Sequence, residues 1–133
     1  MEREISISSQ LRNIERVREF LLLLFDDCGI NKTYFNRVFL GLSEAVCNSI
    51  IHGNGLRADK VVNINAECSE NTLVFEVQDE GDGFFWDQVS DPLSVENIKK
   101  EHGRGILLLK NMADEVEFKD GGRKVLIKYS LPQ

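Results

Sequence analysis

Residues 42–53 read LSEAVCNSIIHG and are the most informative segment for predicting the fold. Its polar residues Glu44, Asn48 and His52 recur every four positions, so they stack along one face of a helix. Their neighbours are largely apolar, and a buried amide without a partner costs about 1–3 kcal/mol. The stripe is therefore either the solvent-facing side of an amphipathic helix or a site where a carboxylate base lies beside an amide oxygen that can ligate Mg²⁺.

Hydrophobic periodicity extends outward from this stretch in both directions. Upstream, apolar residues recur at three- and four-residue steps from Leu11 to Phe25, with Ser8 or Ser9 as the expected cap. Helices are expected over residues 11–28, 31–53 and 106–112, and strands over 4–8, 61–66, 73–77, 116–119 and 123–129. This order predicts an α+β two-layer sandwich, with helices on one face of a mixed, mostly antiparallel sheet and an irregular lid over 84–102.

Length and composition narrow the class of protein. The chain has 133 residues, which suits one domain over 1–133, and a net charge of −6, which disfavours a nucleic-acid-binding surface. The longest strongly apolar run, Phe20–Phe25, is far shorter than the roughly 20 residues that cross a bilayer. We expect no membrane partner, and the absence of a signal pattern at the N-terminus predicts a cytoplasmic location.

The cysteine pattern predicts neither a metal site nor a disulfide framework. The cysteines are Cys28, Cys47 and Cys68, an odd number with no CxxC pair, and only two histidines accompany them. We therefore expect reduced, structural thiols and no zinc site.

Two glycine-containing motifs follow. Residues 79–84, DEGDGF, come directly after a predicted strand, where they form either a turn or a place where a flat ligand approaches the backbone. A calcium loop is excluded, because Phe84 and Ser90 occupy the positions that require glycine and glutamate. Residues 103–105, GRG, open a helix and form either a plain joint or an anion site. Neither a Walker-type nor a dinucleotide-binding glycine pattern occurs.

These three motifs, in this order, resemble the GHKL ATPase superfamily, and within it the small bacterial anti-sigma-factor serine/threonine kinases. Residues 42–53 resemble the first ATP box of that family, 79–84 its DxGxGF box and 103–105 its glycine box, while Pro92 stands where these kinases often carry a proline in the lid. The resemblance extends from Ile5 to Leu131 and implies a Bergerat-type ATP-binding fold.

The resemblance also implies roles for single residues. Glu44 matches the general base, Asn48 the Mg²⁺ ligand and Asp79 the carboxylate that accepts the adenine amino group. The remaining positions are glycines and one arginine that would lie against the base or close over the phosphates: Gly81, Gly83, Gly103, Arg104 and Gly105. The implied cofactors are ATP and Mg²⁺.

By the same resemblance, the expected function is an anti-sigma factor that regulates transcription by partner switching. It would phosphorylate a STAS-domain anti-anti-sigma factor, hold a sigma factor and form a homodimer. The alternative is a non-catalytic protein in which ATP gates partner binding. An ATP-binding fragment of a sensor histidine kinase is less favoured, because neither histidine lies in a dimerisation hairpin.

Overall fold

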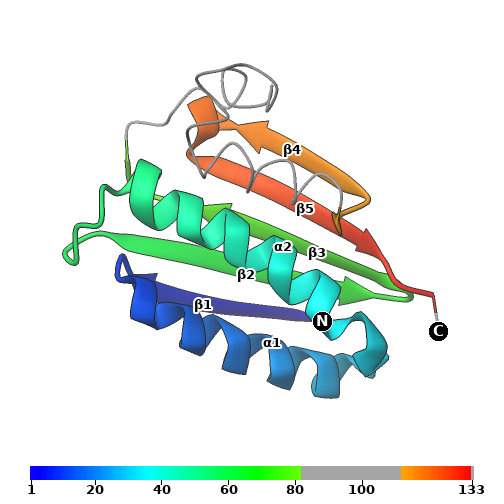
Figure 1. Ribbon diagram of the computed structural model, residues 1–133. Helices are drawn as coiled ribbons and strands as arrows, with labels where there is room; N and C mark the ends of the chain where they lie inside the picture. The colour runs from blue at the N-terminus through cyan, green and yellow to red at the C-terminus, as the bar shows by residue number, and fades with distance from the viewer. Residues whose placement is uncertain (82–111, 133) are drawn as a thin grey trace, which may run out of the picture.

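Two helices cover one face of an antiparallel sheet in the computed structural model, which describes residues 1–81 and 112–132 (Figure 1). The described strands follow the order β1-β2-β3-β5-β4, and every pairing among them is antiparallel. The strands are β1 (Glu2–Ser8), β2 (Val61–Ser69), β3 (Thr72–Gln78), β4 (Glu115–Lys119) and β5 (Lys124–Ser130). The main helices are α1 (Ile14–Cys28) and α2 (Phe35–Asn48), with short helical turns at Leu11–Asn13, Lys32–Tyr34, Ser49–Gly53 and Asp120–Gly122. The predicted α+β sandwich is confirmed. The predicted lid and residues 106–111 of the predicted short helix lie outside the described residues.

The helix boundaries follow local chemistry. Helix α1 ends at Gly29, which takes the left-handed conformation at φ 65°, where a residue without a Cβ fits best. The turn before α2 begins at Asn31, whose side chain accepts a hydrogen bond from the Thr33 N–H at 2.9 Å. The start of the first helix differs from the prediction. Leu11 belongs to a 3₁₀ turn and is 48% exposed, because the apolar face that meets the sheet begins with α1 itself.

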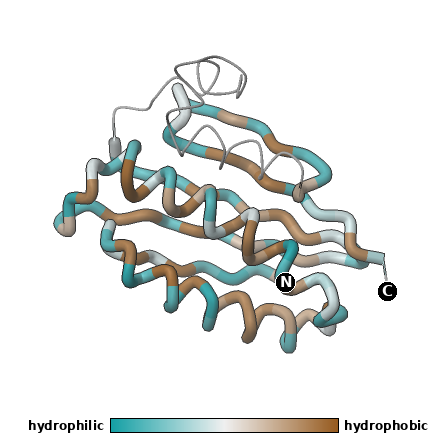
Figure 2. Tube along the Cα trace, in the orientation of Figure 1, coloured by the Kyte–Doolittle hydropathy of each residue, from teal (hydrophilic) through white to brown (hydrophobic). Residues whose placement is uncertain are grey.

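The core lies between the helices and the sheet. Alternate residues of each strand point into it, as shown by the row Ile5, Ile64, Val77 and Val125, which pair across four strands. The buried residues of α1 and α2 are mainly apolar, and Figure 2 shows hydrophobic residues recurring among hydrophilic ones along both helices. The described elements share one hydrophobic cluster, and no helix among them is long and apolar enough to cross a membrane.

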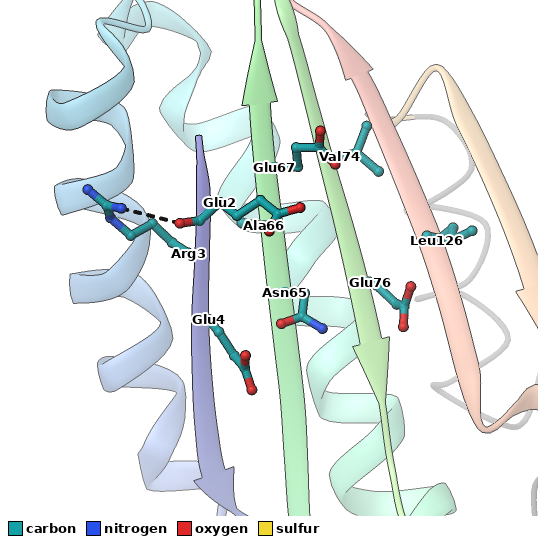
Figure 3. A pocket seen from close by; sticks show the side chains of 9 residues that line it. All are labelled: Glu2, Arg3, Glu4, Asn65, Ala66, Glu67, Val74, Glu76 and Leu126. Atoms are coloured by element: carbon teal, nitrogen blue, oxygen red, sulfur yellow. Dashed lines mark hydrogen bonds between the residues drawn. The ribbon is translucent and has the colours of Figure 1, made fainter.

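The other face of the sheet is mainly polar in the part of the chain that the structure describes. A hollow on it is lined mainly by polar side chains from β1, β2 and β3 (Figure 3), and Glu4, Asn65 and Glu76 form one row across these strands. Of the predicted site residues that the structure describes, Glu44, Asn48, Asp79 and Gly81, none lines this hollow.

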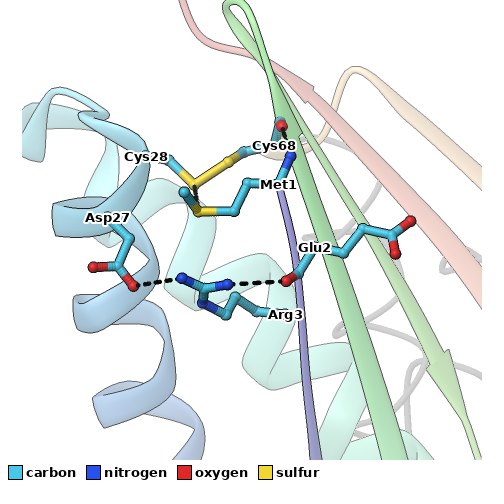
Figure 4. The surroundings of a disulfide bond; sticks show 6 residues. All are labelled: Met1, Glu2, Arg3, Asp27, Cys28 and Cys68. Atoms are coloured by element: carbon cyan, nitrogen blue, oxygen red, sulfur yellow. Dashed lines mark hydrogen bonds and ion pairs between the residues drawn. A yellow bond between two sulfur atoms is a disulfide. The ribbon is translucent and has the colours of Figure 1, made fainter.

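The cysteine prediction is wrong for two of the three thiols. Cys28 and Cys68 form a disulfide that joins the end of α1 to β2 (Figure 4), while Cys47 is free. Their Cα atoms are 6.5 Å apart although 40 positions separate them in the chain, so no local sequence pattern indicates the pairing. The Met1 amino group donates to the Cys68 carbonyl at 3.1 Å, and the Met1 sulfur lies 3.7 Å from the Cys28 sulfur.

Candidate functional site

The C-terminal half of α2 carries the first two predicted site residues. Glu44 and Asn48 lie one turn apart on the same face, with Glu44 half-buried and Asn48 only 4% exposed. After Asn48 the helix widens into a π-turn over Ser49–Gly53. His52 lies in this π-turn and is exposed, whereas Asn48 is buried.

Asp79 follows β3 directly and is 3% exposed. Its Oδ1 accepts a hydrogen bond from the Gly81 N–H at 2.9 Å, and its own N–H donates to the Arg123 carbonyl at 2.9 Å. Burial raises the pKa of the Asp79 carboxyl above its usual value, although the Gly81 N–H and the charge of Arg123 act in the opposite direction. The carboxylate is thus held in a fixed orientation at the end of a strand, with one oxygen occupied by the protein.

Two glycines bring the π-turn against this carboxylate. A Cβ added to Gly53 would lie 2.2 Å from Asp79 Oδ2, and one added to Gly81 would lie 1.8 Å from the Gly53 carbonyl oxygen. Any side chain at either position would push the two segments apart. Glycine at 53 and 81 is therefore what allows the segment after β3 to pack onto the end of α2.

Two buried polar atoms of this site have no partner. Among the described residues, the buried side-chain nitrogen and oxygen atoms without a hydrogen bond are Asn48 Nδ2 and Asp79 Oδ2. Such atoms are rare in native proteins, because each costs about 1–3 kcal/mol when left unpaired. An unpaired carboxylate oxygen fits an amino group of a ligand. A buried amide in the same region fits a cation at its oxygen and a phosphate oxygen at its nitrogen.

Four predicted site residues lie outside the described residues: Gly83, Gly103, Arg104 and Gly105. The described part of the site thus consists of Glu44 and Asn48 on α2, together with Asp79 and Gly81 after β3.

Sequence reasoning missed Asn54, which directly follows the helix expected over residues 31–53. The side chain is 3% exposed and bonds to three separate segments. Its Nδ2 donates to Ser9 Oγ at 2.8 Å and to the Val61 carbonyl at 2.9 Å, while its Oδ1 accepts from the Glu80 N–H at 2.8 Å. The expected cap, Ser8 or Ser9, is wrong, because Gln10 precedes the first helical turn and Ser9 instead donates to the Lys60 carbonyl at 2.9 Å. No local pattern distinguishes such an asparagine from a turn residue.

Comparison with known proteins shows the family of this chain. The family model described as a histidine kinase-like ATPase domain matches residues 7–129. The chain belongs to this family. The resemblance to GHKL proteins is thereby confirmed, and the matched segment contains all three glycine and polar motifs.

Several curated relatives of this ATPase-family chain are anti-sigma F factors. The one from Clostridium beijerinckii is 37% identical over 98 residues, covering 70% of this chain and 68% of the relative. The one from Bacillus thuringiensis is 38% identical over 78 residues, covering 57% of this chain and 53% of the relative. The chain thus spans about half the length of that Bacillus relative.

A solved structure shares the fold. The crystal structure of the RsbU and RsbW domains of a Mycobacterium tuberculosis protein matches 99% of this chain and 32% of its own, with a TM-score of 0.67 and 14% identity. At that identity the match supports the fold alone.

Proposed function

We propose that this ATPase-family chain is an anti-sigma factor that transfers the γ-phosphoryl group of Mg-ATP to a serine or threonine of a STAS-domain partner. The observation that carries the proposal is the pair of unpaired buried atoms, Asn48 Nδ2 and Asp79 Oδ2. Both belong to residues to which the resemblance assigns ligand contacts. The similarity to anti-sigma F factors supports a sigma factor as a second partner.

Each described residue has a chemical task in this proposal. Asp79 Oδ2 would accept the adenine amino group while Oδ1 stays bound to the Gly81 N–H. Guanine presents a carbonyl at that place, which would leave two acceptors facing each other, so the contact selects ATP over GTP. Asn48 would hold Mg²⁺ through its amide oxygen, and the metal would offset the negative charge of the phosphates.

Glu44 would act as the general base. The partner's hydroxyl oxygen would form the new bond to the γ-phosphorus, ADP would leave with the electron pair of the broken bond, and Glu44 would take the hydroxyl proton. Its place one turn before Asn48 supports this role, since base and metal ligand then face the same region.

The decisive experiment separates nucleotide binding from phosphoryl transfer. The chain would be incubated with Mg-ATP labelled at the γ-phosphate and with host lysate, and ATP affinity would be measured in parallel by calorimetry. We expect Glu44→Gln to bind ATP like the wild type but to label no protein on serine or threonine. Glu67→Gln, a matched loss of an exposed carboxylate on β2, should label like the wild type.

Two other results would contradict the proposal in different ways. Nucleotide-dependent capture of a partner without any label would favour the ATP-gated binder, with Glu44 as a structural residue. Failure of the wild type to bind ATP at all would refute the proposed nucleotide site itself.

We further propose a homodimer acting in the cytoplasm, where sigma factors act. Light scattering coupled to size-exclusion chromatography tests the dimer, and a monomer at all concentrations and nucleotide states would refute it. Since cytoplasmic thiols are kept largely reduced, the Cys28–Cys68 bond would be exposed to reduction in that compartment.

A further inference from the structure

Asn54 occupies a junction between the end of α2 and the start of the Asp79 segment. It directly follows Gly53, whose Cα lies against the Asp79 carboxylate, and its backbone N–H donates to the Ser49 carbonyl at 2.8 Å. Its side-chain oxygen accepts from the N–H of Glu80 at 2.8 Å. That N–H belongs to the peptide group that links Asp79 to Glu80, so the bond fixes the orientation of the peptide plane immediately after Asp79.

The side-chain nitrogen of Asn54 is also hydrogen-bonded, to two other segments. It donates to Ser9 Oγ after β1 and to the Val61 carbonyl at the start of β2. A second hydrogen bond joins the start of β2 to the segment after Asp79: the Val61 N–H donates to Glu80 Oε2 at 2.7 Å. Both donor positions and the acceptor of the buried amide are thus engaged, which restricts its rotation to one orientation.

This arrangement determines which Asp79 oxygen is left for a ligand. With the peptide after Asp79 fixed, the Gly81 N–H reaches Oδ1, and Oδ2 remains unpaired beside Gly53. Asn54 is connected to both segments that surround Asp79 Oδ2: it follows Gly53 in the chain, and its side chain accepts a hydrogen bond from the Glu80 N–H. All of these hydrogen bonds of Asn54 are made to the protein itself.

We propose that Asn54 is a positioning residue for base selection, which aims Asp79 Oδ2 at the amino group of adenine. The inference rests on the proposed ATP site and assigns to it a determinant of specificity outside the contacting residues. Loss of the Asn54 side chain should therefore weaken recognition of the amino group more than binding of the rest of the nucleotide.

The test compares ATP with purine riboside triphosphate, which lacks only the 6-amino group, both with Mg²⁺ and by calorimetry. A hydrogen bond to a charged group predicts a wild-type ratio of the two dissociation constants of about 10- to 150-fold. In Asn54→Ala the ratio should fall below about threefold, chiefly through weaker ATP binding. Adding Asn54→Ala to Asp79→Asn should not change the ratio further, because the contact is already absent.

Ser9→Ala is the matched control. It removes one hydrogen bond from the other end of the same amide, leaves the Glu80 bond in place, and should lower the melting temperature without changing the ratio. If Asn54→Ala does not fold, Asn54→Ser keeps a polar group in the site while its shorter side chain removes the direct bond to Glu80.

The outcomes are distinct. A wild-type ratio retained in the folded Asn54 variant, with only a lower melting temperature, would overturn the positioning role and leave Asn54 as a structural residue. A wild-type ratio near one, unchanged in Asp79→Asn, would instead refute the adenine contact in the proposed function, and the inference with it.

Discussion

Removal of the Cys28–Cys68 bond should strongly destabilise the fold while leaving the nucleotide site nearly intact. The two residues are 40 positions apart, and the segment between them contains all of α2 and most of β2. In the chain-entropy treatment, a closed loop of that length lowers the free energy of folding by about 4 kcal/mol. For a domain of this size, about 4 kcal/mol corresponds to a fall in melting temperature of about 14 °C.

Loss of the disulfide should change the affinity for nucleotide much less than it changes stability, because the disulfide and Asp79 lie at opposite ends of the sheet. Cys68 pairs with Leu73 whereas Asn63 pairs with Gln78, which precedes Asp79. The two pairs are five positions apart along each strand, or about 17 Å. Reduction should therefore lower the melting temperature while the dissociation constant for ATP changes by less than about twofold, provided that the protein stays folded at the assay temperature.

The assay is thermal unfolding with and without reductant, for the wild type, Cys68→Ser and Cys47→Ser. Cys47→Ser is the control, since Cys47 is free, and it should keep the full effect of reductant, which Cys68→Ser should lose. Thiol titration of the unfolded, unreduced wild type should find one reactive thiol. Three reactive thiols, or equal melting temperatures with and without reductant, would refute the reasoning.

Three further predictions concern the site. Asp79→Asn should abolish selective ATP binding. Because the pKa of Asp79 is raised in the folded state, its carboxyl stabilises the fold at low pH, and this stabilisation is lost as the pH rises through that pKa. At neutral pH the melting temperature of Asp79→Asn should therefore be no lower than that of the wild type. A clearly lower melting temperature at neutral pH would contradict the argument from burial. Gly81→Ala should lower the free energy of unfolding by about 1–3 kcal/mol in urea denaturation, because its Cβ would meet the Gly53 carbonyl, and wild-type stability would refute the close packing. Burial and the charge of Glu44 raise the pKa of Cys47, so its alkylation should be slow at neutral pH and faster in Glu44→Gln; equal rates by mass spectrometry would exclude an effect of Glu44.

Much of the fold was predictable because its signals are local. The steps from Val17 to Phe25 indicate α1, and alternation around Ile64 indicates β2, since each pattern reflects only the repeat of its own element. Leu11 shows the limit of this reasoning, because an apolar residue at the right spacing is exposed when the chain has not yet begun its α-helix.

The residues of the candidate site also differ in whether a local sequence pattern indicates them. The spacing of Glu44 and Asn48 and the motif after β3 are the sequence signals behind the proposed nucleotide site, and both lie within the residues that the ATPase-family model matches. Asn54 carried no comparable signal, because its bonds reach Ser9, Val61 and Glu80, and a residue between two glycines is indistinguishable from a turn former in sequence.

The order of helices and strands, the family and the polar site candidates can therefore be inferred from the amino-acid sequence. The long-range contacts are seen only in the folded chain: Gly53 against Asp79, Asn54 with Glu80, and Cys28 with Cys68. The difference lies in the distance along the chain over which each feature is set. Periodicity and capping act within a few residues, whereas these contacts depend on strand register and on how α1 and α2 lie on the sheet, which the whole core sets at once.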